Sequence, residues 1–381
     1  MSTSPSEAYF APCPRGLEAL LAAELAALGA RETRTVPGGV AFAGDRETCY
    51  AANLWSRLAS RILWRIAEFD CRDERDLYAA AREVDWPRHF AVERTLRVNI
   101  AARASPLRSL EFAVLRVKDA ICDRFRDAFG RRPDVDRAAP EVRVHLYLEG
   151  TRAALYLDTS GEALFKRGWR TGRVEAPLRE NLAAGIVLLS GWRPEEPLLD
   201  PMCGGATLLI EAAAIARGRA PGANRGFAFE KLADYDPALW ARVRAKPAPA
   251  SPAAAEIYGS DTDPRALAAA RRNLAAAGVE RWVRLERADV LERAAPAPAG
   301  VLIANPPYGE RMGSRAALAD FYPRLGDALK RRFPGWRCYL FTADRELPRR
   351  IRLAPSRRLP LWNGALECRL YEFRMVPGSN R

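Results

Sequence analysis

The sequence predicts an α/β protein in which a helix-covered, largely parallel sheet follows two smaller α+β segments. From residue 198 onward, strand-like apolar runs alternate with helical runs, which is the pattern of a parallel sheet with helices on its faces. The first 160 residues mix short strands and helices without this regular alternation. The chain has 381 residues, whereas one domain typically has ~100–200, so we expect two or three separate cores.

The first 60 residues predict a short α+β segment without a catalytic motif. We expect strands at 7–11, 33–36 and 40–43, the last two forming a hairpin around Pro37-Gly38-Gly39, and helices at 15–28 and 46–59. Residues 60–160 repeat this style. Strands are expected there at 62–69, 96–101, 142–148 and 153–157, and helices at 74–84 and 110–129.

The charge balance of the chain indicates a polyanionic partner. The formal net charge is +13, the sequence pI is near 9.7, and lysine occurs at only five positions, so nearly all the cations are arginines. Arginine forks suit phosphate groups, which favours nucleic acid. A general enrichment in arginine would give the same balance and would predict no particular partner.

Two stretches concentrate these cations. The helix at 110–129 and the residues after it carry Arg116, Lys118, Arg124, Arg126, Arg131 and Arg132, and we expect Leu115, Ile121, Cys122 and Phe125 to form its buried face. Residues 165–173 hold Lys166, Arg167, Arg170 and Arg173 around Trp169, a composition that suits phosphates and a stacked base. The alternatives are a solvated helix face and a solvated linker.

The second half of the chain follows the strand and helix alternation. A helix is expected at 177–189 with Pro177 near its first position, where a missing N–H is tolerated. We expect strands at 257–260, 283–286, 301–304 and 336–342, helices at 206–217, 264–277 and 316–333, and final strands at 351–353 and 366–373 paired antiparallel at one edge. Residues 218–255 are an insertion that ends in a solvated Pro- and Ala-rich tract.

The turn that follows the strand beginning at Leu198 predicts a ligand site. Gly204-Gly205 opens a helix there, so that backbone can approach a ligand closely and the helix N-terminus can accept an anion. The turn lacks the Gly-Lys-Thr/Ser of a P-loop and the spacing of a G-x-G-x-x-G dinucleotide turn. Nucleotide hydrolysis and hydride transfer are therefore disfavoured.

Three acids at successive strand ends favour a cofactor that contains adenosine. Asp200 ends the first strand, Asp261 ends the second, where a carboxylate can accept ribose hydroxyls, and Asp289 closes the third, where it can accept an adenine amine. The separation of Asp200 from Asp261 exceeds the usual ~20 residues because of the insertion. Each acid alone is more often a helix N-cap, but three in order favour the cofactor.

Asn305-Pro306-Pro307-Tyr308, after the fourth strand, is the strongest chemical signal. An exocyclic amine on a nucleobase is a poor nucleophile because its lone pair is delocalised into the ring. The Asn305 side-chain oxygen and the Pro306 carbonyl can hold both N–H bonds and turn the lone pair towards an electrophile, while the prolines fix the direction of that carbonyl. Tyr308 offers a face for a flipped-out base. The alternative is a Pro-Pro turn that only ends a strand.

Cysteine, histidine and hydropathy patterns exclude several other classes. The seven cysteines never show C-x-x-C spacing, which argues against disulfides and structural zinc. Two histidines leave little material for a metal site or a Ser-His-Asp triad. No leader segment and no run of ~18 apolar residues occurs. We expect a cytoplasmic protein that uses no metal and no membrane.

Several motifs together resemble a known family. Asp200-Pro-Met-Cys-Gly-Gly-Ala-Thr207, Gly259-Ser-Asp-Thr-Asp-Pro264 and Asn305-Pro-Pro-Tyr-Gly-Glu-Arg311 look like motifs I, II and IV of class I S-adenosylmethionine-dependent amino methyltransferases. Residues 115–120, 157–161, 166–170, 175–180, 224–230 and 363–369 are similar to the THUMP-domain RNA methyltransferases that make N2-methylguanosine in large-subunit rRNA. The family pattern has Ser-Gly where this chain has Gly205-Ala206.

The resemblance implies a domain order and a set of site residues. It implies a ferredoxin-like domain at 1–58, a THUMP RNA-binding domain at 59–160 and a Rossmann-like methyltransferase domain at 161–381. S-adenosyl-L-methionine would lie against Asp200, Cys203, Gly204, Gly205, Thr207, Asp261, Thr262 and Asp289, and the target guanine against Asn305, Pro306 and Tyr308. The expected RNA contacts are Arg116, Lys118, Lys166, Arg167 and Arg170.

The sequence therefore predicts direct methyl transfer to guanine N2 of RNA, with 23S rRNA as the expected substrate. A covalent route through cysteine is disfavoured because positions 305–308 contain no cysteine and Cys203 belongs to the cofactor turn. A tRNA guanine-N2 methyltransferase and a non-enzymatic RNA assembly factor stay open as alternatives. DNA adenine-N6 or release-factor glutamine methylation would leave the THUMP-like residues unexplained. The oligomeric state is open, with a monomer favoured.

Overall fold

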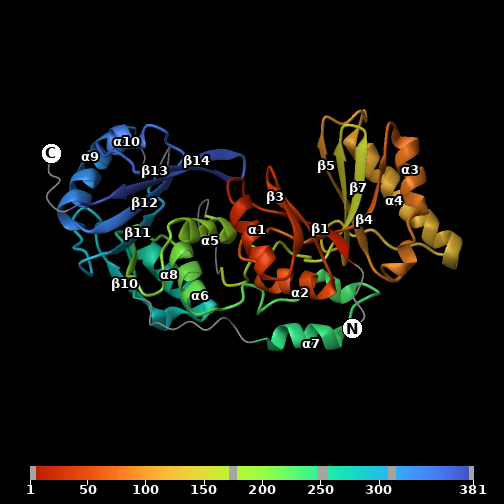
Figure 1. Cartoon of the computed structure of the whole chain (residues 1–381), viewed down its shortest axis with the longest axis horizontal. Helices are drawn as coiled ribbons and strands as arrows, with labels where there is room; N and C mark the ends of the chain where they lie inside the picture. Colours follow the sequence, from red (N-terminus) through yellow and green to blue (C-terminus); the bar gives the residue numbers. More distant parts are fainter. Residues whose placement is uncertain (1–5, 171–177, 247–255, 308–314, 377–381) are drawn as a thin grey trace. The chain divides into compact units, whose positions relative to one another are not determined.

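The computed structural model describes residues 6–170, 178–246, 256–307 and 315–376, and they form two compact units (Figure 1). Unit 1 comprises residues 1–13, 21–164 and 225–246, and unit 2 comprises residues 14–20, 165–224 and 247–381. In the described part of the chain, each unit contains a seven-stranded sheet.

The sheet of unit 1 runs continuously through both α+β segments. Its strand order is β2-β3-β1-β4-β7-β6-β5, and all pairings are antiparallel except that of β5 with β6. The strands are β1 Glu7–Pro12, β2 Arg31–Val36, β3 Gly39–Gly44, β4 Leu63–Asp70, β5 Leu96–Arg103, β6 Val142–Glu149 and β7 Arg152–Asp158. The pairs Tyr9↔Trp64 and Phe10↔Leu63 join β1 to β4, so one sheet spans the two segments.

The helices of unit 1 lie where the hydrophobic periodicity places them. They are α1 Glu18–Ala27, α2 Arg46–Trp55, α3 Glu74–Glu83, η1 Trp86–Arg88 and α4 Leu110–Phe129, and α3 packs on α4. The buried stripe of α4 contains Val117, Ile121 and Phe125, spaced by one helical turn. The expectation that Leu115 is buried is wrong: its position is off this stripe, and it is 43% exposed.

The segment 225–246 folds as part of unit 1 although it is inserted between elements of unit 2. It contains η2 Ala228–Lys231 and α7 Pro237–Ala245. Phe229 stacks on Tyr50 of α2 with ring centroids 4.2 Å apart, and Trp240 meets the edge of Tyr50 at 5.8 Å. This stretch was predicted to belong to an insertion, but its packing against α2 was not predicted.

The sheet of unit 2 has the order β10-β9-β8-β11-β12-β14-β13. Its strands are β8 Leu198–Asp200, β9 Ile257–Asp261, β10 Val283–Arg287, β11 Gly300–Ala304, β12 Trp336–Thr342, β13 Arg357–Asn363 and β14 Leu366–Arg374. The first five are parallel, and β14 runs antiparallel to both β12 and β13. The predicted helix-covered parallel sheet is thus confirmed.

The predicted edge strand at 351–353 is wrong. The edge strand is β13, and residues 351–353 form the turn after α10 Leu347–Arg350. Arg352 there has a φ of 57°, which is left-handed and incompatible with an extended strand. The buried Ile351 beside it contributes to the core rather than to the sheet.

The remaining helices of unit 2 flank the strands that carry the site. They are α5 Glu180–Leu189, α6 Thr207–Ala216, α8 Pro264–Ala277, η3 Glu280–Trp282 and α9 Arg315–Arg332. Helix α5 begins at Glu180 after an extended Arg179, later than predicted, and Pro177 lies outside the described residues. A core of Leu199, Leu302, Leu325, Leu329 and Leu340, among others, fixes β8, β11 and β12 against α9.

Candidate active site

The strand order of unit 2 creates a switch point beside β8. β8 pairs in parallel with β9 on one side, through Leu199↔Tyr258, and with β11 on the other, through Leu199↔Leu302. In open α/β sheets, ligands bind outside the carboxyl ends of the strands at such a point. The turns after β8, β9, β10 and β11 therefore lie at one edge of the sheet, as the sequence predicted.

The turn after β8 is built around a buried carboxylate. Asp200 is 2% exposed, and its Oδ1 accepts the N–H of Met202 at 3.1 Å. Burial raises the pKa of Asp200 to about 8, and the nearby Asp261 acts in the same direction. Burial likewise raises the pKa of the Cys203 thiol, which keeps it protonated and unsuited to nucleophilic attack.

Asp261 connects the first two turns. Its Oδ2 accepts the N–H of Gly204 at 2.9 Å, and its Oδ1 accepts the N–H of Asp263 at 3.0 Å. A carboxylate oxygen has a second lone pair, so each oxygen can still accept a ligand hydroxyl. A Cβ built on Gly204 would meet no atom within 4 Å, so space is open beside this turn.

The helix that follows this turn starts from a strained residue. Ala206 has φ 65° and ψ 25°, the left-handed region that favours glycine, directly before α6. This is the position at which the family pattern has Gly. The turn is held from outside by Asn273 of α8, whose side-chain amide donates to the Gly205 carbonyl at 2.9 Å.

The third acid lies at the same level of the sheet as the other two. Asp261 is paired with Arg287, so Asp289 lies two residues beyond that pair. Its Oδ1 accepts the N–H of Leu291 at 2.9 Å, and its side chain is half-buried. Thr262 is exposed, and its carbonyl accepts from the Arg287 side chain at 3.2 Å.

Asn305 presents a buried acceptor without a donor. Within the described ranges, its Oδ1 is buried and has no hydrogen-bond partner. Such an oxygen costs about 1–3 kcal/mol when it stays unpaired, so its persistence at the switch point indicates a ligand donor. Pro306 is buried, and the Tyr322 hydroxyl donates to the Pro307 carbonyl at 2.7 Å, which fixes the turn. Tyr308, predicted to stack on the base, lies outside the described residues.

The structure corrects one predicted RNA contact in the linker. Arg167 is buried, and its Nε lies 3.4 Å from Glu211 of α6, with side-chain exposures of 4% and 3%. An arginine paired inside the protein is not exposed to RNA, so this prediction is wrong. Trp169 is also buried and cannot offer a face to a base. Lys166 is exposed, and Arg173 lies outside the described residues.

Arg170 is directed towards the cofactor turn rather than towards solvent. Its guanidinium donates to Glu180 at 3.0 Å, to the Leu178 carbonyl at 3.2 Å and to the Thr207 hydroxyl at 3.4 Å. Nη1 is buried and has no hydrogen-bond partner in the described part of the chain. Burial raises the pKa of Glu180, and the Arg170 charge opposes that shift.

The two remaining predicted contacts lie on α4 of unit 1. The Arg116 guanidinium stacks over the Tyr78 ring at 4.1 Å, and Lys118 pairs with Asp119 at 2.6 Å. Both cations are partly exposed, so both remain accessible to a polyanion.

Several residues that shape these sites were missed. Glu211 had a detectable signal, because an acid within the apolar run Leu208-Leu-Ile-Glu-Ala indicates a buried partner. Tyr322 and Asn273 had none, since each acts through a contact 15 or more residues along the chain. Glu180 lies in the motif stretch 175–180, but its pairing with Arg170 was not predicted. Other motif residues are structural: Asp158 pairs with Arg61 and accepts the N–H groups of Ser160 and Gly161 at 2.9 and 3.1 Å.

Three further expectations concern bulk properties. All seven cysteines lie in described ranges, and all are free and buried. Among the described residues, His, Cys, Asp and Glu side chains form no cluster that could hold a metal ion. No helix in the described ranges has the length and apolarity needed to cross a bilayer.

Strand order, switch-point acids and the Asn-Pro-Pro turn together define a Rossmann-like methyltransferase of class I. The comparisons agree with this class. The RMKL-like methyltransferase domain matches residues 167–372, the RlmL ferredoxin-like domain residues 8–63 and the THUMP domain residues 71–158. The chain belongs to the RMKL-like methyltransferase family.

Curated relatives match nearly the whole chain. The "Ribosomal RNA large subunit methyltransferase K/L" of Aeromonas salmonicida is 43% identical over 97% of this chain and 54% of its own length. The chain thus spans about half the length of such curated relatives. The "Putative RNA methyltransferase slr0064" of Synechocystis is 40% identical over 96% of both chains.

Solved structures show the same architecture. The structure of SMU.472 complexed with SAH has a TM-score of 0.88 and 33% identity, and covers 98% of this chain and 99% of that one. A possible methylase from Clostridium difficile 630 has a TM-score of 0.87 and 28% identity, and covers 99% and 100%. TrmN of Thermus thermophilus, at 23% identity and a TM-score of 0.72, shares the fold.

Proposed function

We propose that the protein transfers a methyl group from S-adenosylmethionine to the exocyclic N2 of a guanine in RNA, with 23S rRNA as the substrate. The observation that carries the proposal is the buried Oδ1 of Asn305 at the switch point, which has no hydrogen-bond partner among the residues that the structure describes. It supplies an acceptor for an amine N–H where three strand-end acids can hold an adenosine-bearing donor.

The residues around the first two turns fit the donor. Asp261 keeps a free lone pair on each oxygen for the ribose hydroxyls, and Gly204 leaves open space beside the turn. Asp289 would accept the adenine amine, and Asp200, Cys203 and Thr207 would surround the methionine part. Gly205 and Thr262 are the remaining residues proposed to contact the donor. The donor supplies a methyl group on a sulfonium, a carbon open to attack without metal assistance.

Asn305 and Pro306 would orient the acceptor amine. Their two oxygens take both N–H bonds, so the nitrogen lone pair points at the methyl carbon. The N–C bond forms as the C–S bond breaks, the bonding pair returns to sulfur, and one amine proton leaves to water. Tyr308 would support the flipped-out base by stacking. Nothing in this step requires a covalent enzyme intermediate.

We assign Arg170 to donor binding rather than to RNA. Its bonds to Glu180 and Thr207 place the guanidinium at the first turn of α6, and its Nη1, which no described residue bonds, can meet the carboxylate of the methionine part. Arg116, Lys118 and Lys166 remain proposed RNA contacts. The domain limits 1–58, 59–160 and 161–381, a cytoplasmic location and a monomeric state also remain proposals.

The Asn305→Ala variant tests the catalytic role. We expect the dissociation constant for the donor to change little, because Asn305 lies in the other turn, while kcat falls by about 10²–10³-fold, the usual cost of losing one positioned polar group. Calorimetry and a tritium-transfer assay measure the two quantities. Unchanged turnover would contradict the role.

Nucleoside mass spectrometry decides between RNA classes. Cells that lack the gene should lose N2-methylguanosine from 23S rRNA and keep it in tRNA. Loss from tRNA alone would instead indicate a tRNA guanine-N2 methyltransferase. Intact modification in both, with defective ribosome assembly, would indicate a non-enzymatic assembly factor.

A further inference from the structure

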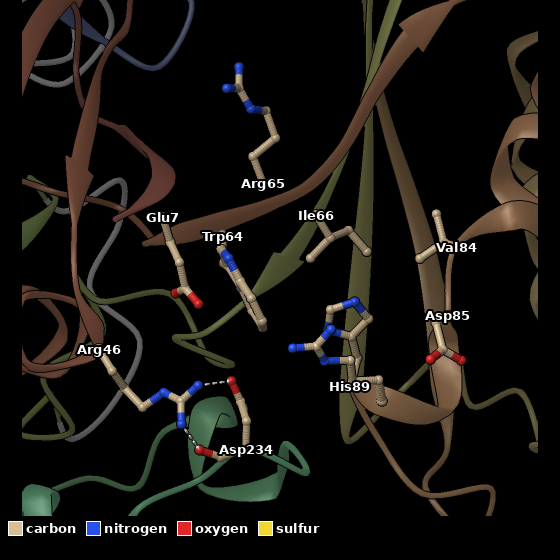
Figure 2. Close-up of a pocket in the computed structure, with 10 residues that line it drawn as sticks. Glu7, Arg46, Trp64, Arg65, Ile66, Val84, Asp85, His89 and Asp234 are labelled. Atoms are coloured by element: carbon tan, nitrogen blue, oxygen red, sulfur yellow. Dashed lines mark hydrogen bonds and ion pairs between the residues drawn. The ribbon is translucent and has the colours of Figure 1, made fainter. Parts of the chain in front are cut away.

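Unit 1 contains a cavity that the proposed methyl transfer does not use. It has a volume of about 390 Å³ and lies where β1 and β4 pair, bordered by η1 and by the inserted segment 225–246 (Figure 2). This volume falls within the ~300–1,000 Å³ typical of small-molecule sites. The side chains that determine its chemistry are Glu7, Arg46, Trp64, Arg88, His89 and Asp234.

An aromatic wall separates the two ends of the cavity. Trp64 and His89 meet edge to face with ring centroids 5.1 Å apart. Burial lowers the pKa of His89, so the imidazole is neutral near pH 7 and adds no charge. Figure 2 shows the Trp64 side chain between those of Glu7 and His89, and Arg65, which also lines the cavity, on the other side of β4. Trp64 is partly exposed and can offer a stacking surface.

The polar groups beside Trp64 are mostly acceptors. Glu7 lies on the same face of the sheet as Trp64, because Tyr9 pairs with Trp64 and alternate residues share a face. One oxygen of Glu7 accepts the Tyr9 hydroxyl at 2.6 Å. Burial raises the pKa of Glu7, which indicates a carboxyl group with incomplete solvation.

Of the arginines that line the cavity, Arg46 and Arg65 are paired with acids, and Arg88 has no such partner among the described residues. Arg46 is engaged by the carbonyl and carboxylate of Asp234, so it closes the floor of the cavity (Figure 2). Arg88 is exposed at the rim, and its guanidinium has no hydrogen-bond or ion-pair partner among the described residues. The free cation lies at the rim and the carboxylates lie inside, whereas a site for a bare phosphate needs its cations inside.

We propose that this cavity receives one unpaired guanine nucleotide of the RNA substrate, at a docking site separate from the methyl-transfer site. The base stacks on Trp64, Glu7 accepts the adjacent N1–H and N2–H of guanine, and Arg88 contacts the backbone phosphate. Adenine lacks this pair of adjacent donors on its Watson–Crick edge, so Glu7 discriminates against it. The inference rests on the proposed RNA substrate but not on the chemistry of the transfer.

Binding of short RNA by the full chain, without methyl donor, tests the proposal. The probes are uridine oligonucleotides with one central guanosine, adenosine or inosine, the last lacking the N2 amine, and affinity is read by fluorescence anisotropy. Wild type should prefer guanosine over inosine and inosine over adenosine. Equal affinity for all three would overturn the proposal.

Three variants locate the preference in the cavity. Trp64→Ala should weaken binding of the guanosine probe by about 5- to 150-fold, the range for losing one stacked base. Glu7→Gln should remove most of the guanosine preference while leaving the adenosine probe unchanged. Arg88→Ala should weaken all probes alike and lower the salt dependence.

Matched controls separate these effects from general RNA affinity and from misfolding. Phe129→Ala removes an aromatic side chain that is 55% exposed on α4, and Arg75→Ala removes an arginine whose side chain is 91% exposed at the start of α3; neither lines the cavity. Both should bind like wild type. If Trp64→Ala lowers the melting temperature, its weaker binding could reflect misfolding, and the Glu7→Gln and Arg88→Ala results then test the proposal. Wild-type affinity in those two overturns the proposal, whatever the outcome of the methyl-transfer assays.

Discussion

The buried Asp200 makes a pH-dependent contribution to stability that one substitution should remove. Burial holds the native pKa near 8, whereas the ordinary value is 3.8. Between these values the native state keeps a proton that the unfolded state has lost, so stability falls as pH rises. Above the native pKa both states are ionised and the loss is complete.

The size of this effect follows from the shift. Each pH unit in this window costs about 1.4 kcal/mol, so the rise from pH 5 to pH 8 costs roughly 4 kcal/mol. Asn at position 200 carries no proton to lose. The free energy of unfolding of Asp200→Asn should therefore increase relative to wild type by that amount over the same interval, in the absence of donor.

Urea unfolding at a series of pH values measures this difference, with Asp45→Asn as the control. Burial raises the Asp45 pKa, but bonds from the Thr48 N–H and hydroxyl outweigh it and leave the pKa lowered. Its contribution is lost only as pH falls below the ordinary value of 3.8. The difference in free energy of unfolding between Asp45→Asn and wild type should stay constant from pH 5 to 8. A constant difference for Asp200→Asn as well would refute the reasoning.

Three further variants follow from the geometry. Ala206→Gly should raise the free energy of unfolding by up to about 1 kcal/mol, because relief of a left-handed residue, worth about 1–2 kcal/mol, exceeds the entropic cost of glycine; a lower value by urea titration would count against strain. Asp158→Ala should destabilise unit 1 by about 3–5 kcal/mol, since it leaves Arg61 without its buried partner; calorimetric unfolding near the wild-type temperature would disprove this. Asp261→Ala should weaken binding of the spent thioether at least about 10²-fold, through lost ribose bonds and a loosened Gly204; wild-type affinity in titration calorimetry would exclude the ribose role.

The position of four proposed site residues at one edge of the sheet could be predicted from sequence, because these residues lie at strand ends. Asp200, Asp261, Asp289 and Asn305 each end or follow a predicted strand, and parallel strands bring such positions to one edge whatever the details of packing. The local sequence pattern that identifies each strand end is therefore sufficient to predict that these residues share one edge of the sheet. The same logic located most helices and strands within a few residues.

The cations of the linker could not be assigned from composition. Arg167 and Arg170 are equally basic in sequence, but each is paired with a buried acid, Glu211 or Glu180, that lies at least ten residues away. Whether an arginine faces RNA or a carboxylate depends on this pairing, and the local sequence around Glu211 indicates a buried partner without identifying it as Arg167. The packing of Phe229 on Tyr50 escaped prediction for the same reason.

Label transfer in vitro tests the central proposal most directly. The protein is incubated with ribosomal RNA and a donor that carries a deuterated methyl group. The RNA is then digested, and its nucleosides are separated by chromatography and identified by mass spectrometry. The account predicts the label in N2-methylguanosine, with none in a parallel reaction of Asn305→Ala. Label in any other nucleoside, or no label although the donor is bound, would contradict it.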